Sequence, residues 1–115
     1  MSAEADRDGR DREAVHIVAI EDGRVIGTCR LLFRGREARL GRLAVEPAKR
    51  GRGVGATILR EADRVSVSGG ADRISLHAQT HALQLYAREG YMERGTRFME
   101  EGIEHVAMVK PLHEP

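Results

Sequence analysis

The 115-residue chain has little cysteine and few aromatic residues. Cys29 is its only cysteine, so no disulfide can form within the chain, and we expect a reducing, cytoplasmic environment. Aromatic residues make up 3% of the chain and tryptophan is absent. Nucleic-acid-binding surfaces usually combine aromatic stacking with a basic bias, so we do not expect a nucleic-acid partner.

An excess of charge of one sign is also missing, as is any long hydrophobic run. The chain has 19 Lys and Arg residues against 18 Asp and Glu residues, so its overall field should not attract polyanions. No segment approaches the length of a membrane span, and the polar N-terminal stretch lacks the apolar core of a signal peptide. We expect a soluble protein without a membrane partner.

The length fits one domain with a single core. Residues 1–13 alternate charges and offer no apolar face, so we expect a disordered arm there. The domain itself is expected to span residues 14–112.

Glycine is abundant, and three alternating glycines form a loop directly before the longest helical pattern. Apolar residues recur at helical spacing from Val54 to Val65. Glycines allow consecutive N–H groups to point into one concavity, and a helix N-terminus adds unpaired donors and a positive dipole end. The pattern predicts a pyrophosphate site made by Arg50, Gly51, Arg52, Gly53, Val54, Gly55 and Ala56.

Other interpretations of this loop remain open on the residues alone. It could be a solvated surface turn, because short glycine motifs are common. A Walker loop is excluded, since no Gly-Lys-Ser/Thr follows the glycines. A dinucleotide loop fits Gly51-x-Gly53-x-x-Ala56 formally, but the next strand ends in Gln79 instead of a ribose-binding acid.

Strand patterns precede the loop. The apolar, β-branched runs Val15–Ile20 and Val25–Phe33 flank Asp22-Gly23, a pair typical of tight hairpins. A third strand is expected over Glu37–Val45, with Ala38, Leu40, Arg42 and Ala44 on one face, and Gly41 suggests a bulge or a close backbone approach within it.

Alternating helices and strands follow the loop. The helix after the loop predicts a crossover to a parallel strand over Arg73–Ala78. A short helix over Ala82–Ala87, a strand from Tyr91 and a last strand over His105–Val109 complete an α/β (α+β) domain.

The motif Arg50-x-x-Gly53-x-Gly55, preceded by Leu43-Ala44-Val45, resembles the acyl-CoA signature of the GNAT acetyltransferase superfamily. Ala78-Gln79-Thr80-His81, Tyr86 and Gly90-Tyr91 are similar to its ElaA-like branch. The resemblance implies a GNAT-like, mixed and mostly antiparallel sheet with a β-α-β acyl-CoA-binding core in residues 14–112. It also implies that the family's opening strand and two following helices are missing, which makes the domain N-terminally short.

The resemblance further implies acetyl-CoA as cosubstrate and direct transfer of its acetyl group to an amine of unknown identity. The backbone of Leu43, Ala44 and Val45 would bond the pantetheine arm beside a splayed strand. Tyr86 would protonate the departing thiolate, although a tyrosine on an apolar helix face can simply be a core residue. Gln79 would bind the acceptor or pantetheine.

The general base is left open by the sequence. Arg39 occupies the place where some family members carry an acid, so Glu37 is one candidate and His81 is another. Each has an ordinary alternative, a solvated strand-end charge for Glu37 and a structural hydrogen bond for His81. His77 and His81 alone do not make a metal site, and we expect no metal.

Two other functions compete with an enzyme. One is a non-catalytic acyl-CoA-binding module, and the other is a nicotinamide dinucleotide module, which would require a parallel sheet beginning at the loop. A sheet without its first strand would also expose an edge, so we expect a homodimer.

Overall fold

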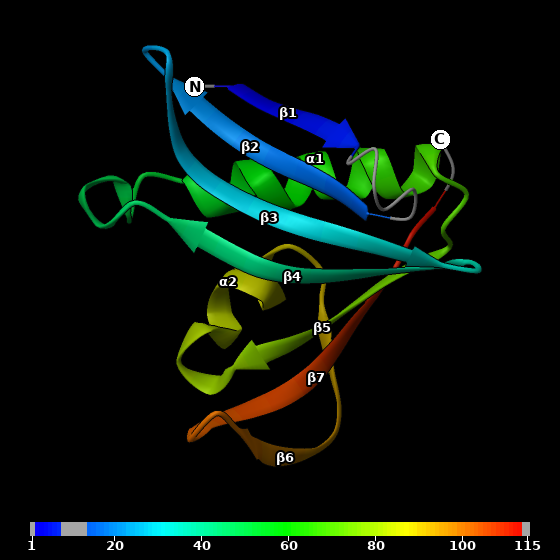
Figure 1. Ribbon diagram of the computed structural model, residues 1–115. Helices are drawn as coiled ribbons and strands as arrows, with labels where there is room; N and C mark the ends of the chain where they lie inside the picture. The colour runs from blue at the N-terminus through cyan, green and yellow to red at the C-terminus, as the bar shows by residue number, and fades with distance from the viewer. Residues whose placement is uncertain (1, 8–13, 114–115) are drawn as a thin grey trace.

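The computed structural model describes residues 2–7 and 14–113, which form one seven-stranded sheet and two α-helices (Figure 1). The strand order is β1-β2-β3-β4-β5-β7-β6. All neighbours are antiparallel except β4 and β5. The elements are β1 (Ser2–Arg7), β2 (Ala14–Glu21), β3 (Arg24–Arg34), β4 (Glu37–Val45), α1 (Val54–Ser68), β5 (Arg73–Gln79), α2 (Leu83–Arg88), β6 (Met92–Glu100) and β7 (Ile103–Pro111).

The expected order of strands and helices after residue 14 is confirmed. Asp22 and Gly23 both have positive φ, 51° and 76°, as a tight two-residue hairpin turn requires. This turn joins β2 to β3, and the chain continues as an antiparallel meander into β4. The sheet before the glycine loop is therefore antiparallel, which excludes the dinucleotide alternative.

The N-terminal segment corrects two expectations. Residues 2–7 form β1, which pairs with β2 from Ser2–Ile20 to Arg7–Val15, so an arm is wrong for these residues. The opening strand is also present instead of missing. Strand pairing uses backbone groups, which a charge pattern does not reveal, and Ala3 packs against the core. Residues 8–13 lie outside the described part of the chain.

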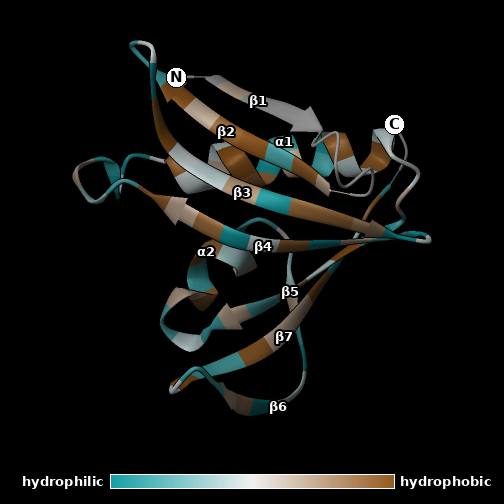
Figure 2. Cartoon of the chain, in the orientation of Figure 1, coloured by the Kyte–Doolittle hydropathy of each residue, from teal (hydrophilic) through white to brown (hydrophobic). Residues whose placement is uncertain are grey.

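Helix α1 lies along one face of the sheet, behind β2, β3 and β4 in Figure 1. Its buried residues include Val54, Ile58 and Ala62, the apolar positions that predicted it. Hydrophobic residues are concentrated along the strands that it covers, whereas the loop before it is mostly hydrophilic (Figure 2). The resulting core is continuous and includes Ile17, Cys29, Leu31, Ile74, Leu76, Val106 and Met108.

The parallel strands β4 and β5 pair only briefly. Their ladder consists of Glu37–Arg73, Ala38–Ile74 and Arg39–Ser75, after which no further pair forms. Both strands then continue towards the same end of the molecule and separate, with α2 beside the gap (Figure 1). We call the point beyond Arg39 and Ser75 the fork.

A bulge lies in β4 just beyond the fork. Arg30 and Thr28 of β3 pair with Gly41 and Ala44, so β4 has one extra residue here. The expectation of a bulge is confirmed, although the positive φ, 56°, belongs to Arg42 and not to Gly41.

The bulge corrects the expected faces of β4. Leu43 and Val45 pack against the core, as Ala38 and Leu40 do, whereas Ala44 is exposed. Strict alternation would have placed Ala44 with the core, but the additional residue reverses the alternation.

Among the described residues, neither helix combines the length and the hydropathy that crossing a membrane would require.

Candidate active site

The glycine loop between β4 and α1 is open to solvent. Gly51 and Gly53 have φ of 77° and 80°, and a Cβ built on either would meet no atom within 4 Å. Residues 50–53 are exposed. The glycines are therefore required for the backbone conformation, and the space beside them is free for a ligand.

The backbone N–H groups of the loop have no partners within the protein. No hydrogen bond among the described residues uses the N–H groups of residues 51–56, and the first one of the helix runs from Thr57 N–H to the Gly53 carbonyl, 3.0 Å. Gly53 is the N-cap, and it has no side chain that could accept a bond. A row of unpaired donors at the positive end of α1 is suited to an anion.

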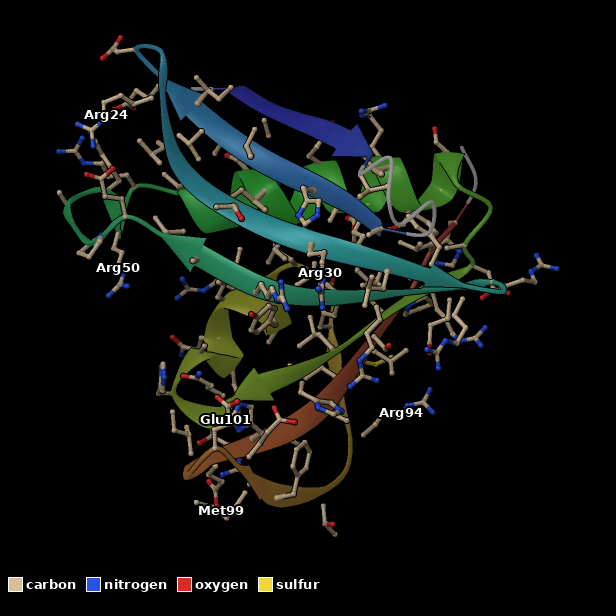
Figure 3. All side chains as sticks on the ribbon, viewed as in Figure 1. Arg24, Arg30, Arg50, Arg94, Met99 and Glu101 are labelled. Carbon is tan, nitrogen blue, oxygen red and sulfur yellow. The ribbon has the colours of Figure 1, made fainter. Side chains whose placement is uncertain are left out.

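Basic side chains surround these donors. Arg50 donates from Nε to the Val45 carbonyl oxygen, 3.2 Å away, which holds its guanidinium between the loop and the end of β4. Figure 3 shows Arg50 on this loop. Arg52 is exposed, while Lys49 is bonded to Glu21 at 2.7 Å. That hydrogen bond, with the charge of Lys49, lowers the pKa of Glu21.

The open backbone edge of β4 begins at the fork. No residue from Leu40 to Val45 pairs with β5, so the outward N–H and C=O groups of this segment have no strand beside them there. The segment leads directly to the glycine loop. An extended, peptide-like ligand could bond to this edge as an added strand, as predicted for Leu43, Ala44 and Val45.

Tyr86 lies in α2, on the helix side of the sheet. Its side chain is 8% exposed, and its ring packs edge-on against Tyr91 with centroids 5.8 Å apart. Burial raises the pKa of Tyr86, and the neighbouring Cys29 raises it further. Cys29 lies on β3 between Thr28 and Arg30, the two residues that pair with β4 on either side of its bulge. Because Tyr86 is a neighbour of Cys29, Tyr86 also lies near the fork. A phenol with a raised pKa stays protonated and can donate its proton.

Gln79 and His81 meet at the end of β5. The His81 Nε2 and Gln79 Oε1 atoms are 2.5 Å apart, so the imidazole donates to the amide oxygen. His81 is exposed and Gln79 is half-buried. Both residues therefore lie at the end of β5, beside the gap between β4 and β5 (Figure 1), and one nitrogen of His81 is already used in the hydrogen bond to Gln79.

Glu37 is not brought together with the other predicted residues. It begins β4, at the closed end of the parallel ladder, and its carboxylate is 3.6 Å from Arg73 Nε. Val45 is eight residues away along the strand, about 26 Å at the usual rise.

A polar network at the fork was missed by sequence reasoning. His77 contacts Arg39 Nη2 through Nε2 at 2.8 Å, and its Nδ1 is 3.1 Å from Glu100 Oε1. The alternation of β5, which buries Leu76 and Ala78, could have placed His77 on the same face as Gln79. The partner Glu100 comes from β6, which no local pattern indicates. Within the described ranges, no three His, Cys, Asp or Glu side chains are grouped to hold a metal.

A mixed sheet forked beside a glycine loop, with the loop amides free at a helix N-terminus, defines an acyl-CoA-binding fold of the GNAT type. The sequence matches the family described as acetyltransferase (GNAT) domain over residues 2–112. The chain therefore belongs to the GNAT family, and the predicted superfamily and fold are confirmed.

Relatives support this assignment. The chain is 31% identical over 111 residues to the uncharacterized N-acetyltransferase YjcF of Bacillus subtilis, covering 96% of this chain and 79% of that one. An acyl-CoA N-acyltransferase from Pseudomonas aeruginosa has a similar structure, with a TM-score of 0.75, 27% identity and coverage of 84% and 68%. Escherichia coli ElaA gives a TM-score of 0.77 at 24% identity, covering 90% and 73%, a likeness of fold. The family is one of N-acyltransferases that use acyl-CoA.

Proposed function

We propose that this N-acyltransferase uses acetyl-CoA and transfers the acetyl group directly to an amine. The observation that carries the proposal is the row of unpaired N–H groups in residues 51–56, aligned with the open edge of β4. Arg50 through Ala56 would hold the pyrophosphate, and Leu43 to Val45 would hold the pantetheine arm. Bound acetyl-CoA supplies an activated acyl group as a thioester.

The residues of the chain would orient the reactants and move protons. The loop and β4 fix one end of the thioester, so the amine meets its carbonyl at the fork. The C–N bond forms as the C–S bond breaks, Tyr86 gives its phenolic proton to the departing thiolate sulfur, and the proton lost by the amine passes to His81 or to water. His81 or Gln79 contacts the acceptor side. Glu37 stands apart and in an ion pair, so we do not assign the base to it.

Replacement of Gly53 by glutamate tests cofactor binding. The new side chain would place bulk and negative charge among donors that require an anion, so we expect no measurable coenzyme A binding by calorimetry. Gly53 has a positive φ, so the change also strains the backbone.

Gly35→Glu is the matched control for that strain. Gly35 also has a positive φ, 59°, and open space around its Cβ position, but it lies in the β3–β4 turn. We expect Gly35→Glu to bind coenzyme A like the unaltered protein. Equal affinity of the two variants would overturn the assignment of the loop.

A further inference from the structure

One half-buried arginine on the sheet face opposite α1 has a guanidinium nitrogen that is buried without a partner. Arg30 Nε is fully buried and has no hydrogen-bond partner, and Arg30 joins none of the ion pairs among the described residues. Its neighbours on β3, Cys29 and Leu31, point into the core, so Arg30 points to the other face. Figure 3 shows it there, over the strands and away from α1.

This state is unusual among the arginines of the described segments. Among the arginines whose side chains are described, most of the others form an ion pair or hydrogen bond, and those that do not are exposed, namely Arg34, Arg42, Arg52, Arg88 and Arg94. The buried Nε–H of Arg30 has lost its hydrogen bond to water, and no group of the described residues replaces it. Such a group is suited to an anionic ligand that would complete its hydrogen bonds.

The space beside Arg30 is open. Arg30 pairs with Gly41 of β4, so both residues project to the same face, and a Cβ built on Gly41 meets nothing within 4 Å. On the other side Arg30 pairs with His16. His16 in turn pairs with Asp6 of β1. The cationic side chain of Arg30 therefore lies next to the open space over Gly41.

A second unpaired polar atom lies on the same face. Ser75 Oγ is buried without a hydrogen-bond partner, and Ser75 belongs to the last pair before the fork, opposite Arg39. Gly41 is two residues beyond Arg39, about 7 Å along the strand. Arg30 and Ser75 thus flank β4 at the place where the thioester carbonyl would emerge.

We infer that the acceptor is an amine that also carries a carboxylate, and that Arg30 binds this carboxylate at the open position over Gly41. The inference rests on the proposed function. The Nη–H groups of Arg30, which lie beyond the buried Nε, match the two oxygens of a carboxylate. The short distance to the fork selects acceptors in which a few carbons separate the amine from the carboxylate.

The direct test is a titration observed at Arg30 itself. In the 15N-labelled full chain, the Arg30 Nε–Hε resonance is assigned by its absence in Arg30→Gln. β-Alanine should shift this resonance saturably, whereas β-alaninamide, which has the same amine and no carboxylate, should not. Gly41→Val, which fills the open position, should abolish the shift. No response, or equal responses to both probes, would overturn the inference.

Turnover provides the second arm. Glycine, β-alanine and 4-aminobutyrate are compared with their amides in a thiol-release assay. Arg30→Gln should lower kcat/KM for the acid by about 10- to 100-fold and leave that for the amide within about threefold. Arg94→Gln, which removes an exposed arginine of β6, should change neither. An amide used as well as its acid would contradict the inference.

The two arms separate the inference from the proposed function. If no amine of either series releases thiol, the proposed transferase activity fails, and the titration alone decides whether Arg30 binds a carboxylate. If turnover occurs without a preference for acids, the transferase stands and the role of Arg30 is refuted.

Discussion

At the scale of single residues, two tyrosines in contact have different expected roles. Tyr86 stands near the fork, whereas the Tyr91 hydroxyl is buried without a partner. We expect Tyr86→Phe to lower kcat about 100-fold or more, because the thiolate loses its proton donor, with coenzyme A affinity within about threefold. Tyr91→Phe is the matched control and should retain activity. Equal losses in both variants would indicate packing alone.

The pH dependence of Tyr86 follows from its burial. Because burial raises its pKa above the ordinary value near 10, the phenol stays protonated through the neutral and moderately alkaline range. The unfolded chain releases this proton at lower pH than the folded chain, so the residue's contribution to stability is complete below pH ~10 and falls above it.

Cys29 should not react with thiol reagents in the folded protein. It is fully buried, and burial raises its pKa to about 12, so almost no thiolate exists near neutral pH. We expect a thiol reagent at pH 8 to leave the native chain unmodified and to label it fully in urea. Rapid stoichiometric labelling of the native chain would show that this part of the core opens.

At the scale of elements, Gly27 sets the approach of α1 to the sheet. A Cβ at Gly27 would lie 2.8 Å from Ile58 Cδ1, 3.1 Å from Val54 Cγ1 and 3.2 Å from the Ala44 carbonyl oxygen. We expect Gly27→Ala to lower the free energy of unfolding by about 1–3 kcal/mol, measured by urea denaturation. Gly41→Ala, with open space, is the control and should change it little. If Gly27→Ala left the free energy of unfolding unchanged, α1 would have to move away from the sheet without loss of stability.

The elements also show what the sequence could predict. Period-two and helical patterns, with Asp22-Gly23 and the glycine loop, are local, and they indicated every strand and helix after residue 14. Arg50, Tyr86 and Gln79 were recognisable because they belong to motifs. The pairing of β1 was not predictable from side chains, since backbone groups make it.

Contacts between distant elements were the other gap. Arg30, whose Nε is buried without a partner, lies between His16 and Gly41, which come from two other strands. The exclusion of Glu37 from the site depends on the end of β4 at which the ladder with β5 forms. Neither follows from spacing along the chain.

At the scale of the whole molecule, the exposed edges of the sheet differ from the one that the sequence predicts as a dimer contact. The edge of β2 that was expected to be exposed is covered by β1, so β1 and β6 are the outer strands. A homodimer remains a prediction, now through one of these edges. Sedimentation equilibrium at micromolar concentrations should show a mass that rises towards twice 12.7 kDa. A constant monomer mass would contradict it.

The brief ladder between β4 and β5 makes the molecule two antiparallel halves, held side by side by three residue pairs and the helices. A pantetheine arm lying along the unpaired part of β4 would supply hydrogen bonds that the sheet itself leaves out. Cofactor binding and resistance to heat would then be linked, and Tm should climb with coenzyme A concentration. The enzyme would reach its full rigidity only with coenzyme A bound. Depletion of the cofactor in a cell would therefore also shorten the lifetime of the protein.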